Sequence, residues 1–131
     1  MKEIFNLYCD EFCDNCTKII VEIDPEYDYF INFIIETDGF KGHGPIYLFE
    51  NDVPVYIDKI ESMYQTLKGK CRIQDTESED SFVEFEFKER KLFFTGLISN
   101  YFQKLIFECE VDQTILNSLL LVLKKINNNK E

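Results

Sequence analysis

Alternating apolar and charged residues in the segment SFVEFEFK, residues 81 to 88, constrain the fold of this chain more than any other feature. Val83, Phe85 and Phe87 are apolar, and the residues between them are glutamates. Successive side chains of a strand point to opposite faces of its sheet. The segment therefore predicts a strand with one apolar face and one charged face.

Further strands and two helices are expected along the chain. Asp52 and Asp112 mark helix starts, because each can accept a hydrogen bond from a free N–H of the first helical turn. Gly69 is expected to end the first helix. The order β-β-β-α-β-β-β-β-α follows, with strands at 18–23, 29–36, 45–50, 70–74, 81–88, 91–99 and 101–111 and helices at 53–68 and 113–126. This order predicts an α+β fold with a curved, mainly antiparallel sheet of about seven strands.

The whole chain, residues 1–131, is expected to form a single domain. Hydrophobic residues make up 45 % of it, enough for one core, and no low-complexity linker divides it. Residues 1–16 form a cysteine-rich, acidic lead-in, and residues 127–131 are expected to be a frayed tail.

Several positions opposite the expected core face are apolar. They are Phe30, Ile34, Phe93, Leu97 and Ile106. A face fully exposed to water would be more polar. Either the sheet curls so that helices or loops cover both of its faces, or an apolar patch is left for a partner.

The chain carries 25 acidic and 14 basic residues, a formal net charge of −11. This charge argues against nucleic acid as a ligand and favours a basic partner. Acids are densest in residues 75–89 and 10–28. Neither a signal peptide nor an apolar run long enough for a membrane span is evident, so a cytoplasmic protein with reduced cysteines and no membrane association is expected.

Three cysteines, Cys9, Cys13 and Cys16, lie close together near the N-terminus. Structural zinc requires four ligands, and His43 is the one plausible fourth ligand. Alternatively, the three are unmetallated thiols that share one face of a short helix and pack on the sheet. Two further cysteines on strands, at positions 71 and 109, are expected to be buried thiols.

His43 is the only histidine, and it lies in KGHGP, which is expected to be a loop between two strands. Gly42 and Gly44 are assigned to turn geometry. A single histidine with no adjacent orienting partner is expected to be a turn residue, and the chain contains no recognisable catalytic motif. The protein is therefore expected not to be an enzyme and to need no cofactor.

Between residues 27 and 126 the ordered segments resemble the WapI-type bacterial immunity proteins of polymorphic toxin systems. The resemblance runs through DPEYDYFINFIIETDGFKGHG, ENDVPVYIDKIESMYQTLKGKCRI, LFFTGLI and LIFECEVDQTILNSLLLVLKKI. It implies a cytosolic binding protein that neutralises a cognate toxin, often a nuclease. Carboxylates could take the places of phosphates in a basic nuclease cleft.

The acidic run of residues 75–89 is the expected contact surface for such a toxin domain. Asp80, Glu84, Glu86 and Glu89 are its predicted contact residues. The alternative hypothesis is a metal-binding or redox-responsive module built on the N-terminal cysteines.

Overall fold

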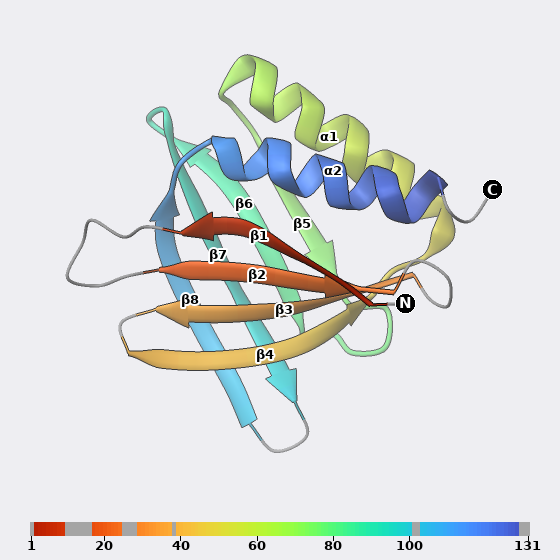
Figure 1. Ribbon diagram of the computed structural model, residues 1–131. Coiled ribbons are helices and arrows are strands. Elements are labelled where there is room, and N and C mark those ends of the chain that lie inside the picture. Colours follow the sequence, from red (N-terminus) through yellow and green to blue (C-terminus); the bar gives the residue numbers. More distant parts are fainter. Residues whose placement is uncertain (1, 10–16, 25–28, 38, 101–102, 129–131) are drawn as a thin grey trace.

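The computed structural model describes residues 2–9, 17–24, 29–37, 39–100 and 103–128 (Figure 1). Within these residues the chain forms two four-stranded antiparallel sheets and two α-helices. The first sheet contains β1 (Glu3–Cys9), β2 (Lys18–Ile23), β3 (Phe30–Thr37) and β4 (Phe40–Tyr47). A short 3-10 turn, η1 (Glu50–Asp52), then leads into α1 (Val53–Thr66). The second sheet contains β5 (Lys70–Gln74), β6 (Phe82–Lys88), β7 (Lys91–Asn100) and β8 (Gln103–Val111), and α2 (Thr114–Asn128) follows it.

This architecture confirms the α+β class and the expected order of elements, but it corrects the expectation of one curved sheet. The described residues contain eight strands in two sheets. The additional strand is β1, in the segment expected to be a lead-in. Its pairing with β2 shifts register between Asn6 and Tyr8, and Ile4 is exposed. Such a bulge interrupts the alternation by which a strand is recognised.

The inner faces of the two sheets form one core. Phe94 of β7 lies at its centre and is fully buried. Its ring centroid lies 4.5 Å from that of Phe85, 4.9 Å from that of Phe107 and 6.4 Å from that of Phe33. Because Phe33 belongs to β3, these ring contacts join the two sheets.

Glycines allow the two sheets to approach closely where β4 crosses β7 and β8. A Cβ on Gly44 would lie 2.6 Å from the backbone oxygen of Ser99, and one on Gly42 would lie 2.8 Å from the Cδ2 atom of Leu105. The segment KGHGP, expected to be a loop, is therefore part of β4. These glycines serve a close backbone approach, and the expectation that they serve a turn was wrong.

The two helices close the open side of this sandwich. In the described structure α1 packs beside β5, and α2 packs between α1 and β1 (Figure 1). Lys124 of α2 pairs with Glu61 of α1 at 2.7 Å, and Lys125 pairs with Glu3 of β1 at the same distance. Neither helix is long and apolar enough to cross a membrane, and no other described segment forms such a helix.

The two expected helix caps differ in outcome. Asp112 accepts a hydrogen bond from the backbone N–H of Thr114 at 2.9 Å, which confirms its capping role. Asp52 makes no side-chain capping bond. The reason is that η1 runs directly into α1, so Asp52 already has helical backbone angles.

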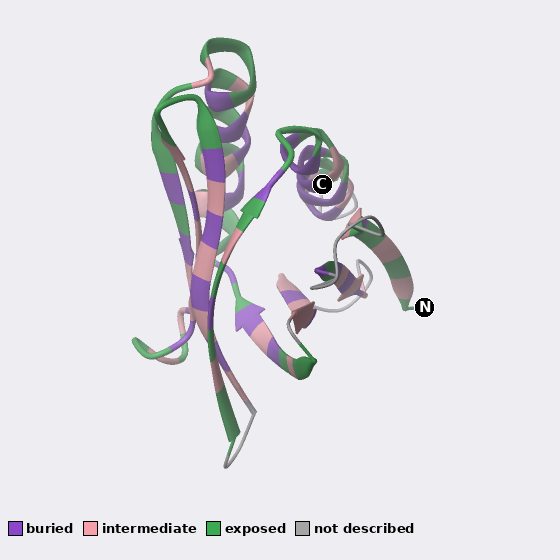
Figure 2. Ribbon diagram, turned by 90° about the vertical axis from the view of Figure 1, so that its left-hand side faces the viewer, coloured by how far each residue is buried: buried purple, intermediate pink, exposed green. Residues whose placement is uncertain are grey.

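Neither helix covers the outer face of a sheet. Figure 1 looks onto the outer face of the first sheet, and Figure 2 shows the second sheet with no helix over its outer side. The outward apolar residues expected from the sequence lie on these faces. Four of them are half-buried by their neighbours, and Ile106 is 81 % exposed. Within the described residues no helix covers these faces, and Ile106 is the exposed member of the five.

Candidate binding surface on the second sheet

Three rows of side chains cross the outer face of the second sheet from β6 to β8. The strand register places Phe82, Leu97 and Ile106 in one apolar row. The next row contains Glu84, Thr95 and Glu108, and the third contains Glu86, Phe93 and Glu110. Facing residues on neighbouring strands have Cβ atoms about 5 Å apart, so each row is continuous.

The apolar row becomes more exposed toward β8. The guanidinium of Arg72 on β5 lies 3.9 Å from the ring centroid of Phe82 and covers it. Leu97, in the middle, is half-buried. Ile106, on the edge strand, is 81 % exposed. The open end of the row is therefore at β8.

The acidic side chains follow the same gradient. Glu84 pairs with Arg72 at 3.2 Å, and Glu86 pairs with Lys88 at 3.8 Å. Glu108 and Glu110 have no ion pair within the part of the chain that the structure describes, and both are exposed. On this face, and within the described residues, the two acids without an ion pair are thus both on β8.

The structure brings together only two of the four predicted contact residues. Glu84 and Glu86 share the outer face of β6. Asp80 lies before β6 and pairs with Lys104 at 3.7 Å. Glu89 lies in the turn after β6, beside a cavity of about 410 Å³ that Leu67 also lines. Asp80 and Glu89 lie beyond opposite ends of β6, whose seven residues span roughly 20 Å at 3.4 Å per residue.

The acidic run of residues 75–89 is only partly a free surface. Asp75 is buried and accepts hydrogen bonds from the backbone N–H groups of Tyr47 at 2.9 Å and Glu77 at 3.3 Å. The side-chain amide of Gln74 donates to the carbonyl of Ser81 at 2.9 Å. Asp75 therefore joins the loop to the first sheet, a structural role that its place in an acidic run did not reveal.

Sequence reasoning did not select Glu108 and Glu110 as contact residues. The alternation of LIFECEV identifies them as outward-facing, and that signal was available. Acid density pointed instead to residues 75–89. Which acids have a cation opposite them depends on strand register, which local sequence does not give.

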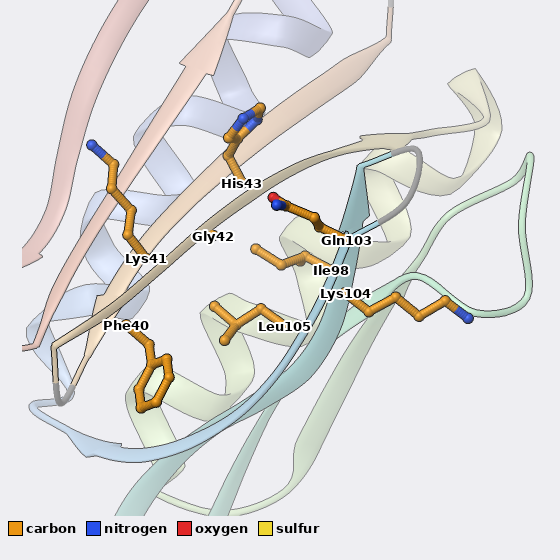
Figure 3. A pocket seen from close by; sticks show the side chains of 8 residues that line it. All are labelled: Phe40, Lys41, Gly42, His43, Ile98, Gln103, Lys104 and Leu105. Atoms are coloured by element: carbon orange, nitrogen blue, oxygen red, sulfur yellow. The ribbon is translucent and has the colours of Figure 1, made fainter.

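His43 lines a cavity of about 330 Å³ between β4 and the β7–β8 hairpin. Its walls include Ile98, Leu105 and the basic residues Lys41 and Lys104. Figure 3 shows Lys41 and His43 leaving β4 on the side away from Leu105, and Lys104 pointing away from the cavity. The basic side chains do not converge on one point, so the cavity shows no built anion site.

Of the four residues of the alternative metal site, the structure describes Cys9 and His43, and it places them on opposite edges of the first sheet. Cys9 is exposed at the end of β1, whereas His43 is on β4, the opposite edge strand. Three interstrand spacings separate these edges, about 14 Å. Cys13 and Cys16 lie outside the described residues, among which no three potential metal ligands cluster.

The two strand cysteines of the second sheet face inward. Cys71 is buried, and this burial raises the pKa of its thiol to about 11. Cys109 is half-buried, and its thiol donates a hydrogen bond to the carbonyl of Phe94 at 3.6 Å. The expectation of buried thiols is confirmed for Cys71 and holds in part for Cys109.

These features define an α+β fold in which, among the described residues, no helix covers the outer face of the second sheet. The chain matches no protein family model, no curated protein and no solved structure. The charges and apolar side chains of that face are therefore the observations that bear on function.

Proposed function

We propose that this chain is a non-catalytic binding protein that neutralises a cognate toxin domain, such as a nuclease, by covering the toxin's basic surface. The outer face of the second sheet is the proposed contact surface. The observation that carries the proposal is the exposed Ile106 beside Glu108 and Glu110, two acids without an ion pair in the described structure. The resemblance to WapI-type immunity proteins supports the same function.

An exposed apolar side chain next to charged ones is suited to protein binding. Burial of Ile106 would contribute the hydrophobic centre of an interface. Arg or Lys residues of a basic toxin could pair with Glu108 and Glu110 without displacing a cation of this chain. Complementary charge would also accelerate the encounter, most strongly at low salt.

The four contact residues predicted from the sequence remain within the proposal, but three of them have a smaller role because a cation already pairs with each, and the fourth, Glu89, lies in the turn after β6. Arg72 already compensates Glu84, and Lys88 and Lys104 compensate Glu86 and Asp80. A partner must displace these exposed pairs before it gains new ones, so its net gain is small. We therefore place the centre of the surface on β8.

Co-expression with a toxin tests the proposal. If the gene beside that of this chain encodes a toxin, the wild-type chain should restore growth of cells that express it. The double variant Glu108→Lys/Glu110→Lys should lose this protection and bind the purified toxin at least 100-fold more weakly, with a flatter dependence on salt.

The matched control is Glu22→Lys/Glu36→Lys on the outer face of the first sheet, which changes the charge by the same amount. It should protect cells as well as the wild type does. The proposal is wrong in its choice of surface if the β8 variant protects fully, or if both variants lose protection equally while remaining folded.

A further inference from the structure

We infer that the partner binds by adding an extended, basic segment as a fifth strand along β8, in addition to contacting the outer face. This inference rests on the proposed function, because it names how that surface takes its partner. It assigns β8 the role of an open sheet edge and predicts the sequence pattern of the added strand.

Among the four edge strands of the described structure, β8 has the least cover. β1 packs against α2, β5 packs against α1, and β4 crosses the second sheet. Among the strands that the structure describes, β8 pairs only with β7, and it meets β4 near Leu105, where β4 has Gly42. It lies along the left border of the second sheet in Figure 1. In the described structure its C-terminal part, from Ile106 to Val111, is therefore available for pairing.

The turn between β6 and β7 sets the direction of the backbone groups across the second sheet. Glu89 and Arg90 have φ values of 52° and 69°, and Lys88 pairs with Lys91. Two successive residues with positive φ define a two-residue type I′ hairpin, in which the flanking residues form a hydrogen-bonded pair. Even-numbered residues of β6 therefore direct their N–H and C=O groups toward β7.

Two bonds on the other side of β6 agree with this assignment. The N–H of Phe87 donates to the carbonyl of Gly69 at 2.9 Å, and the N–H of Asp75 donates to the carbonyl of Ser81 at the same distance. Odd-numbered positions along β6 thus face β5. The same alternation continues across β7, whose even-numbered residues face β8.

The residues of β8 that lie opposite the even-numbered residues of β7 therefore form backbone hydrogen bonds with β7. Cys109, opposite Phe94, is one of them. Ile106, Glu108 and Glu110 then direct their N–H and C=O groups away from β7, toward the open edge. The same three residues carry the outward side chains of the proposed surface. Backbone and side-chain groups for a partner thus come from one set of residues.

The negative charges of Glu108 and Glu110 favour a basic segment as the strand added at this edge. An added antiparallel strand would place an apolar residue opposite Ile106 and basic residues opposite Glu108 and Glu110, which gives the pattern basic-x-basic-x-apolar. A second copy of this chain carries the same net charge of −11, and this like charge disfavours self-association. A basic partner is therefore the occupant that fits.

A capped peptide, Thr-Lys-Thr-Arg-Thr-Val-Thr, is a direct probe of the edge. In a titration of the isotope-labelled chain followed by NMR, it should shift the amide signals of Ile106, Glu108 and Glu110 and slow their hydrogen exchange. The same peptide with Glu in place of Lys and Arg should do neither. Absence of these changes at millimolar peptide, or changes confined to other residues, would overturn the inference.

Backbone pairing is separated from charge by comparing Glu108→Pro with Glu108→Thr. Both variants remove the carboxylate, but only proline also removes the N–H that faces the edge, and an edge strand tolerates proline at such a position. Binding to the toxin should be at least tenfold weaker for Glu108→Pro than for Glu108→Thr. If the proline variant does not fold, modified peptides provide the test. N-methylation of the Lys and Arg backbone amides of the peptide should abolish binding. N-methylation of the backbone amides of its third and fifth residues, both Thr, should leave binding unchanged.

The outcomes distinguish this inference from the proposed function. Equal binding by Glu108→Pro and Glu108→Thr, with binding lost in Glu108→Lys/Glu110→Lys, would overturn strand addition and leave the surface in place. Unchanged binding by the double charge variant would refute both. A dimer of the free chain that is broken by Glu108→Pro would show a second copy on the edge and would overturn the choice of partner.

Discussion

The outer faces of the two sheets differ although both sheets are four-stranded antiparallel meanders over one core. On the first sheet Glu22 pairs with Lys2 at 3.6 Å and Glu36 pairs with Lys41 at 3.3 Å. On the second sheet, within the described structure, the acids of edge strand β8 have no such partner. Lysines of the same chain pair with these acids of the first face. On the second face, the acids of β8 have no such ion pair in the described structure.

Each outer face has an exposed apolar residue on an edge strand, Ile4 on β1 at 65 % and Ile106 on β8 at 81 %. Ile20 and Ile34 lie side by side on β2 and β3, the two central strands of the first sheet, and shield each other. On the second sheet the apolar row continues to the edge and ends at the exposed Ile106. Folding requires only the inner faces to be apolar. Ile106 differs from Ile4 because it lies beside acids that have no ion pair in the described structure, whereas Ile4 lies opposite Glu22, which pairs with Lys2.

The largest expected effect on the free energy of unfolding comes from a substitution on the inner face of β7, compared with one on its outer face. Phe94→Ala should lower the free energy of unfolding by about 3–5 kcal/mol, because it removes the ring at the centre of the core. Phe93→Ala, on the outer face of the same strand, should cost about 1 kcal/mol. Denaturant unfolding measures both, and equal losses would contradict the assignment of the two faces.

The second effect tests how tightly the inner faces are packed. A Cβ on Gly96 would lie 2.4 Å from the carbonyl oxygen of Phe82, so Gly96→Ala should destabilise the protein by about 2–3 kcal/mol. Thr95→Val, on the outer face next to it, should change stability by less than about 0.5 kcal/mol. A Gly96→Ala variant as stable as the wild type would show that the strands are not so closely placed.

The third effect depends on pH. Burial raises the pKa of the Cys71 thiol from 9.0 to about 11. Below pH 9 the thiol is protonated in both states. Between pH 9 and pH 11 it loses its proton mainly in the unfolded state, so stability falls as pH rises, by about 2–3 kcal/mol for a shift of this size.

Cys71→Val should remove this contribution. The comparison of the wild type with the variant at each pH cancels the titration of the other residues. A constant stability difference between pH 8 and pH 11 would mean that the thiol is not buried as described.

The smallest effect compares the acids of the two outer faces directly. Glu22→Lys/Glu36→Lys removes two ion pairs and should lower stability by about 0.5–1.5 kcal/mol at low salt, and by less at high salt. Glu108→Lys/Glu110→Lys removes no pair and should change stability by less than about 0.5 kcal/mol. A larger loss in the second variant would show that these acids serve the fold.

Much of the fold could be predicted because its signals are local. The alternation of residues 81–88 and the apolar face of the last helix follow from period and capping alone. Period two assigns faces to a strand but does not say which strands pair, so two sheets could not be told from one. The Gly42 and Gly44 pattern was misread as a turn because a close crossing of β4 over β7 is a tertiary contact.

The candidate site was predictable only as a set of outward acids. Alternation placed Glu84 and Glu108 correctly on the outer face, but it could not show that Arg72 lies opposite Glu84 and that Glu108 faces an open edge. Those facts depend on the register of β5, β6 and β8. The density of acids in the sequence therefore predicted a contact surface on β6, where Arg72 and Lys88 already pair with the glutamates.

Amide hydrogen exchange of the chain, alone and in complex with the proposed toxin partner, tests the central claim most directly. The account predicts that exchange at Ile106, Glu108 and Glu110 slows in the complex, while the amides of the outer face of the first sheet exchange as before. Protection confined to the first sheet, or absent from β8, would contradict it.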